Sequence, residues 1–296
     1  MGLAPRNLAL GNLAQRFLVA LVAVPILLVL LHYDRPEPTW ALIFVASLIA
    51  MHEFFVMTLP PEDRRAAVIM GGLACLAFYW LDPTALAVYG NDAPAGLFRF
   101  AAVGGSTVAL MLAVIVPGLY FLFRFRDIPS VASRVTATVM GIVYAGFLTT
   151  FLAKLKLIDP AREQDTVLIV LLVAWVADTG GYFAGRYLGK KKLYEAVSPK
   201  KTWAGAFGGI AGSILGVALL KLVTAHWLSW VDVFLLAIPG GILGQLGDLS
   251  ESLIKRSVGV KDSGALLPGH GGILDRIDAV LFIAPYVYVY LLLKFT

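Results

Sequence analysis

Apolar residues along this chain fall into long uninterrupted runs. A helix that spans the hydrocarbon core of a bilayer needs about 20 mostly apolar residues. The runs predict nine transmembrane helices, at residues 16–31, 39–57, 66–81, 100–123, 135–152, 166–186, 203–224, 231–249 and 273–293. The third run is the weakest, because Asp82 and Pro83 end it early. The runs are not strict alternations of apolar and polar residues, which excludes a transmembrane β-barrel.

Composition points to the same class. Hydrophobic residues make up 59% of the 296 residues and charged residues 15%, whereas soluble domains average about 45–50% and about 25%. A soluble enzyme and a disordered chain are therefore excluded, and we expect an all-α polytopic membrane protein. We expect one integral membrane domain over residues 1–296, with 1–164 as a lipid-facing scaffold and 165–296 as the catalytic helices. Cys75 is the only cysteine, so no intrachain disulfide can form.

The distribution of Lys and Arg predicts the orientation in the membrane, because positive residues concentrate in cytoplasmic loops. The N-terminal segment and the even-numbered loops hold 16 of the 24 Lys and Arg residues, and the odd-numbered loops with the C-terminus hold 6. We therefore expect a multi-pass protein of the cytoplasmic (inner) membrane, with the N-terminus in the cytoplasm and the C-terminus outside. The net charge of +5 reflects these loops, and no nucleic-acid partner is expected.

Acidic residues stand inside or at the ends of the last predicted helices. An ionised side chain within a span costs roughly 2.5–3.5 kcal/mol and is functional by default. The predicted topology collects these carboxylates at one depth on the cytoplasmic side: Asp178, Asp248, Glu251, Asp275 and Asp278, with Glu53 on the same side. Hard oxygen ligands without a His or Cys cluster suit Mg²⁺. The alternative is that they pair with Lys255, Arg256 and Arg276.

Basic residues and glycines form the other half of the pattern. The segment SPKKTWAG, residues 198–205, directly precedes a predicted helix, and Ser198 or Thr202 can cap its N-terminus. With Lys200 and Lys201 beside it, this helix end predicts an anion site. The loop before the last helix adds Lys255, Arg256, Lys261 and His270 and the glycines Gly264, Gly269, Gly271 and Gly272. Carboxylates for Mg²⁺ with lysines for polyphosphate indicate phosphoryl or nucleotidyl transfer at the cytoplasmic interface.

At these residues the chain resembles the phosphatidate cytidylyltransferases, also called CDP-diacylglycerol synthases. Residues 252–278, SLIKRSVGVKDSGALLPGHGGILDRID, match every position of their signature. The segments ADTGGYFAGRYLGK and SPKKTWAG are also similar to the family, although Ala204 stands where the family commonly has Glu.

The resemblance implies the reaction of CTP with phosphatidate to give CDP-diacylglycerol and pyrophosphate. It also implies an all-helical membrane homodimer with a polar cavity open to the cytoplasm, and a paired centre of Mg²⁺ and K⁺ held by Asp248 and Asp275. The catalytic residues would be Asp248, Asp275, Lys255, Arg256 and Asp278. The substrate-binding residues would be Ser198, Lys200, Lys201, Thr202, Lys261, Asp262, His270, Gly271, Gly272, Arg276 and Asp178.

Two other functions fit parts of the pattern. A CTP-dependent lipid or polyprenol kinase would share the membrane site and the nucleotide but would transfer the γ-phosphoryl group. A transporter would suit glycine-broken helices with charges near the midplane. The charges here are predicted at one face, however, and no inverted repeat is evident.

The orientation can be tested by labelling single cysteines in a Cys75→Ser background with a membrane-impermeant reagent. On intact cells, we expect a cysteine at Ser229 or Thr296 to be labelled from outside. A cysteine at Ser198 or Ser263 should react only after the membrane is opened. External labelling at Ser263 would overturn the predicted topology.

Overall fold

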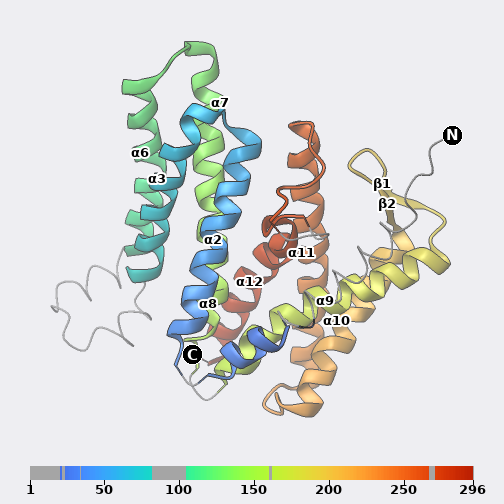
Figure 1. Ribbon diagram of the computed structural model, residues 1–296. Helices are drawn as coiled ribbons and strands as arrows, with labels where there is room; N and C mark the ends of the chain where they lie inside the picture. The colour runs from blue at the N-terminus through green and yellow to red at the C-terminus, as the bar shows by residue number, and fades with distance from the viewer. Residues whose placement is uncertain are drawn as a thin grey trace.

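The computed structural model describes residues 21, 24–33, 35–81, 105–159, 162–266 and 271–295. The described chain is a bundle of helices (Figure 1). In order they are α2 (Glu37–Thr58), α3 (Pro61–Trp80), α6 (Ser106–Arg124), α7 (Ile128–Gly141), the π-helical turn η2 (Ile142–Phe147), α8 (Leu148–Leu155), α9 (Glu163–Leu188), α10 (Trp203–Val223), α11 (Trp230–Ser257) and α12 (Leu274–Phe295).

The polytopic helical class is confirmed. Within the described residues, seven helical segments are long and apolar enough to span a membrane, and α7, η2 and α8 form one of them. Each lies over a predicted span. The third predicted span is also a helix, α3, but Glu62, Asp63, Arg64 and Arg65 in its first turns keep it out of this set. The first predicted span lies mostly outside the described residues, although 24–31 are helical. The count of nine and the orientation stay predictions.

A short β-hairpin departs from the expected all-helical chain. Strands β1 (Lys192–Tyr194) and β2 (Ser198–Thr202) pair antiparallel between α9 and α10, with Lys192 opposite Thr202 (Figure 1). The Lys192 ammonium donates a 2.5 Å hydrogen bond to the Pro199 carbonyl oxygen across the hairpin. The segment preceding α10 is therefore extended, which holds its lysines next to the helix N-terminus.

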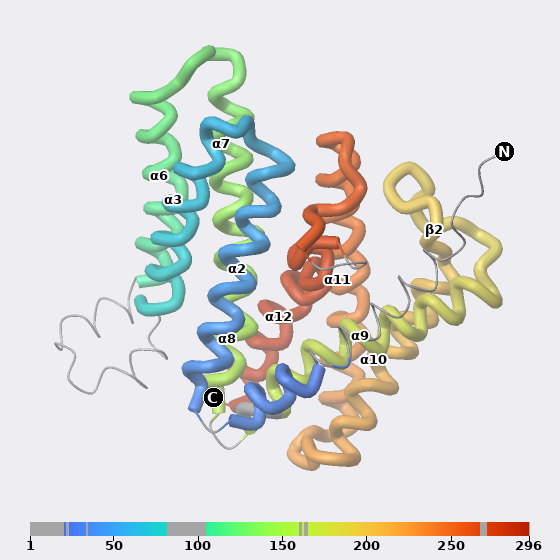
Figure 2. The backbone as a smooth tube through the Cα atoms, viewed as in Figure 1, coloured from blue at the N-terminus to red at the C-terminus, as the bar shows by residue number. Residues whose placement is uncertain are grey.

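Helices α9 and α10 run side by side in unusually close contact (Figure 2). A methyl group at Gly180 would collide with the carbonyl oxygen of Gly208, and one at Gly212 would collide with the carbonyl oxygen of Val176. Small residues allow such backbone contact between membrane helices, where dispersion forces replace the hydrophobic effect. The glycines therefore fix how the two helices, and the hairpin that joins them, are placed.

Helix α12 joins the two parts of the core. Ile283, Ala284, Val287 and Leu291 belong to a buried apolar cluster shared with α8, α9, α10 and α11. On the same helix, Leu281 belongs to a second cluster built by α2, α3, α6 and η2. Figure 2 shows α12 between α2, α3 and α6 on one side and α9, α10 and α11 on the other. The start of α12 is therefore positioned by both halves of the chain.

We expect Gly180→Ala to destabilise the protein, because the added methyl group meets backbone that cannot move without separating α9 from α10. The cost should be about 1–3 kcal/mol, as for other overpacked interiors. Thermal unfolding in detergent measures it. Gly118→Ala on α6 is the matched control, since nothing lies within 4 Å of the new methyl group. Equal stability of the two variants would contradict the close packing of α9 on α10.

Candidate active site

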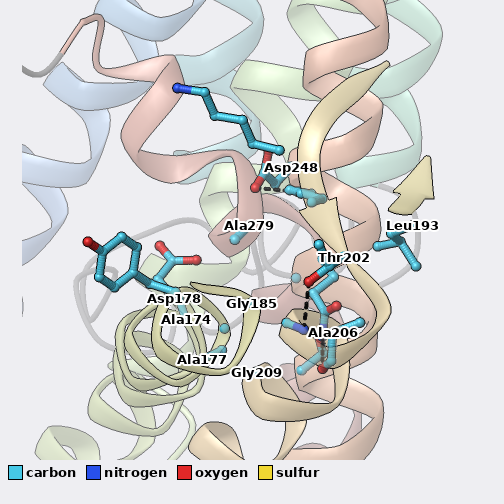
Figure 3. A pocket seen from close by; sticks show the side chains of 18 of the residues that line it. Ala174, Ala177, Asp178, Gly185, Leu193, Thr202, Ala206, Gly209, Asp248 and Ala279 are labelled. Atoms are coloured by element: carbon cyan, nitrogen blue, oxygen red, sulfur yellow. Dashed lines mark hydrogen bonds and ion pairs between the residues drawn. The ribbon is translucent and has the colours of Figure 1, made fainter. Parts of the chain in front are cut away.

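A cavity of about 550 Å³ lies among α9, α10, α11, α12 and the hairpin. This is within the usual size of a small-molecule site, about 300–1,000 Å³. Figure 3 shows Asp178 of α9 on one side, Thr202 and Ala206 on the other, and Asp248 of α11 between them. The polar or charged side chains that line it are Asp178, Tyr182, Arg186, Lys200, Lys201, Thr202, Gln245 and Asp248. Five of these were predicted site residues.

Opposite charges meet inside the cavity. The Lys201 ammonium lies 2.5 Å from the Asp248 carboxylate, and both side chains are partly exposed to the cavity. Asp178 has no hydrogen bond or ion pair within the described part of the chain, and the charged groups that act on it are Asp248, Lys201 and Arg276. The cavity therefore presents one carboxylate, Asp178, and two cations, Lys200 and Arg186, that form no ion pair within the described residues.

The N-terminus of α10 lies on the cavity wall. Thr202 is its N-cap, and the hydroxyl oxygen accepts a 3.1 Å hydrogen bond from the Gly205 amide (Figure 3). Of the two predicted caps, Thr202 is therefore confirmed, while Ser198 belongs to strand β2. Gly205 and Ala206 of the first turn line the cavity. The positive end of the helix dipole makes this end favourable for an anion.

A second charged cluster is buried next to α11. The Lys255 ammonium lies 2.5 Å from the Glu251 carboxylate and 2.6 Å from the Asp275 carboxylate. Asp275 also accepts hydrogen bonds from the amides of Ser263 and Gly272, at 3.0 and 2.8 Å. The three charged side chains are all at least nine-tenths buried. Asp275 therefore does not line the cavity, and the alternative of an ion pair with Lys255 is present in the structure.

Gly271 and Gly272 shape the turn that precedes α12. Gly271 has a φ of +80°, which non-glycine residues rarely adopt, and a methyl group there would lie 2.5 Å from an Asp275 oxygen. The glycines of the signature segment thus allow the backbone to approach and bind Asp275.

Similarity to known proteins shows the family of this chain. The sequence profile described as "Cytidylyltransferase family" matches residues 14–294. The chain belongs to the cytidylyltransferase family. Similar proteins include phosphatidate cytidylyltransferases of Bacillus subtilis (29% identity over 282 residues, 95% of this chain and 98% of the relative), Synechocystis sp. (36% over 199 residues, 58% and 67%) and Brucella suis (43% over 150 residues, 51% and 55%). The chain thus spans about half to nearly all of the length of these relatives.

Other predicted residues of this cytidylyltransferase family site lie outside the cavity wall. Arg256 is exposed and donates a 2.8 Å hydrogen bond to the Val260 carbonyl oxygen at the end of α11. Asp278 is half-buried, and Asp248, Asp178 and Lys255 are among the charged groups that act on it. Lys261, Asp262 and Arg276 are exposed. His270 lies outside the described residues.

The structure adds residues that sequence reasoning missed. Arg186 donates a 2.6 Å hydrogen bond to the Tyr182 hydroxyl and lies over the rings of Tyr182 and Tyr187, so its guanidinium is held at the cavity. Gln245 of α11 donates to the Ala206 carbonyl oxygen at 3.1 Å and ties α11 to α10. Arg186 stands within the family-like segment ADTGGYFAGRYLGK. Its charge at the end of an apolar helix is the feature of the sequence that could have indicated a role in the site.

Proposed function

We propose that this chain transfers the cytidylyl group of CTP to phosphatidate, giving CDP-diacylglycerol and pyrophosphate. Membership of the cytidylyltransferase family and the relatives named phosphatidate cytidylyltransferase support this. The observation that carries the proposal for this chain is the cavity itself. Its two lysines and helix N-terminus suit the phosphates of a nucleoside triphosphate, and its two carboxylates, Asp178 and Asp248, suit the cation that accompanies them.

In this reaction an oxygen of the phosphatidate phosphate attacks the α-phosphorus of CTP. The bond from that phosphorus to the bridging oxygen breaks, and pyrophosphate leaves. A phosphate group is already ionised at neutral pH, so no strong general base is needed. Lys200, Lys201 and the α10 N-terminus would bind the triphosphate and neutralise charge on the leaving group, and Arg186 would hold the phosphate of the lipid.

The cofactor in this proposal is Mg²⁺. Among the described residues no three His, Cys, Asp or Glu side chains converge on one point, which fits a metal bound by one or two carboxylates together with substrate phosphates. Asp248 is suited to it, because one of its oxygens has only a 3.3 Å contact with the Ser252 hydroxyl. Bound there, Mg²⁺ would neutralise the triphosphate.

Asp275 is the second proposed ligand. Both of its oxygens already accept hydrogen bonds, so binding a cation would require the Lys255 ammonium to give up its contact. K⁺ as a second cation and a homodimer, both implied by the family resemblance, belong to the same proposal.

The proposed active site faces the cytoplasm, with the N-terminus on that side and the C-terminus outside. CTP is a cytoplasmic solute, and the excess of positive residues in the even-numbered loops supports this orientation.

One assay tests the function against its alternatives. The purified protein in detergent–lipid micelles is incubated with phosphatidate, Mg²⁺ and CTP labelled either in the cytosine ring or at the γ-phosphate. We expect the ring label to enter the lipid phase and the γ-label to leave as pyrophosphate. Transfer of only the γ-label to a lipid would indicate a kinase. Transfer of neither label would contradict both enzymatic functions and leave the transporter.

Asp248→Asn and Asp275→Asn should each nearly abolish cytidylyl transfer while the protein stays folded. The first removes a charge from the cavity, and the second removes one of the two carboxylates that pair with Lys255. The rate per folded molecule, with folding checked by thermal unfolding, measures the effect. Asp165→Asn is the control, because Asp165 bonds Thr224 and Trp227 away from the cavity. Wild-type turnover in Asp248→Asn would refute the proposed cation site.

Lys200→Ala and Lys201→Ala should raise the KM for CTP by about 10-fold or more, the scale of a lost charge-assisted hydrogen bond. Initial rates over a range of CTP concentrations give this value. Lys191→Ala is the matched control, since Lys191 is exposed and does not line the cavity. An equal rise in all three variants would favour a general charge effect over binding at the cavity.

A further inference from the structure

Glu53 connects the N-terminal helices to the loop that carries the proposed site. It lies on α2, is only 6% exposed, and contacts residues more than 200 positions later in the chain. A carboxylate so deeply buried is costly unless its oxygens are hydrogen-bonded. No lysine or arginine pairs with it among the described residues, so hydrogen-bond donors must compensate its charge.

Those donors lie on either side of residues 267–270, the part of the α11–α12 loop that the structure does not describe. The Ile273 amide donates to one Glu53 oxygen at 3.0 Å. The Leu274 amide and the Ser263 hydroxyl donate to the other, at 2.9 and 3.1 Å. The two amides belong to the start of α12, where backbone N–H groups lack partners within the helix. Glu53 therefore supplies, from another helix, the N-terminal cap of α12.

The same short segment binds Asp275. Ser263 donates its hydroxyl to Glu53 and its amide to Asp275. Gly272, which donates its amide to Asp275, directly precedes the Ile273 amide that donates to Glu53. Neighbouring donors along this backbone thus bind the two carboxylates, so that a movement of Glu53 would also move the groups that hold Asp275.

The backbone of the loop packs tightly against the Glu53 carboxylate. A methyl group at Gly264 would lie 2.7 Å from one Glu53 oxygen, and a methyl group at Gly272 would collide with the other and with the Ser263 hydroxyl. The position of the carboxylate and the path of the loop therefore determine each other.

We propose that Glu53 is a positioning residue, which sets the orientation of Asp275 and the first turn of α12 by binding Ser263, Ile273 and Leu274. This inference rests on the proposed function, in which Asp275 belongs to the cation site. It assigns to the N-terminal helices a direct part in building that site. An ionised carboxylate is required, because an amide would turn a donor toward the donors of the loop.

The test compares Glu53→Gln with Asp63→Asn. Asp63 is an equally buried carboxylate, on α3, whose partner is Arg134 at 3.1 Å and which has no hydrogen bond or ion pair with the described part of the α11–α12 loop. The first measurement is hydrogen–deuterium exchange of the protein without substrate or metal. In Glu53→Gln we expect residues 271–277 to exchange at least about 10-fold faster, because the cap that opposes local opening is lost. In Asp63→Asn this segment should be protected as in the wild type.

The second measurement is kinetic. Glu53→Gln should lower kcat for cytidylyl transfer by about 10-fold or more, as is typical when residues that orient metal ligands are changed. The KM for CTP should stay near the wild-type value, since the proposed triphosphate-binding lysines lie on the hairpin. Glu53→Asp, which keeps both acceptor oxygens, should recover part of kcat. Asp63→Asn should keep the wild-type kcat per folded molecule.

Wild-type exchange at 271–277 in Glu53→Gln would overturn the inference. So would a loss of kcat matched by Asp63→Asn, because that effect would be one of general stability. If Glu53→Gln does not fold, Ser263→Ala replaces it, since this variant removes one donor and keeps the amide that binds Asp275. It must then speed exchange at 271–277, and an unchanged rate would refute the proposal. Failure of the proposed function would instead leave the exchange result intact and remove only cytidylyl transfer.

Discussion

A charged group buried in a largely apolar protein needs a partner of opposite charge or hydrogen-bond partners beside it. The ion pairs of the buried Lys255 ammonium with Glu251 and Asp275 are the interaction on which this site depends. Removing either carboxylate would leave a buried charge without its full set of partners, which costs several kcal/mol in typical proteins. The contact joins α11 to the start of α12. It therefore sets the distance between the two helices that carry Asp248, Glu251, Asp275 and Asp278.

The charged groups that line the cavity are less completely paired than those of this buried cluster. Lys201 and Asp248 are paired but partly exposed. Among the described residues Asp178 has no partner, and Arg186 is held by Tyr182 and Tyr187 without an ion pair. The buried charged side chains that neutralise one another form the rigid base of the site. The charged side chains that lack a full set of partners face the cavity, where a nucleotide, a lipid phosphate and a cation would neutralise their charge.

The two halves of the chain are joined through α12. Its apolar face contributes to both buried clusters, and its first amides are bound by Glu53 from α2. The close contact of α9 with α10 positions the hairpin and its lysines on the other side of the cavity. The site thus lies between one wall fixed by glycine-mediated backbone contact and another fixed by buried hydrogen bonds.

Long apolar runs determined the helical membrane class, because twenty-residue segments of this kind have no other stable form in a bilayer. The spacing of Asp, Lys and Gly between residues 252 and 278 was enough to identify the family. Hydropathy could not predict the hairpin at 192–202, because its strands, of three and five residues, are short and mostly polar. Nor could it show that Asp275 pairs with Lys255, that Arg186 faces the cavity, or that Glu53 caps α12. The contacts of Asp275 with Lys255 and of Glu53 with Leu274 join residues 20 and 221 positions apart, and only the packing of the helices determines which partner each charge receives.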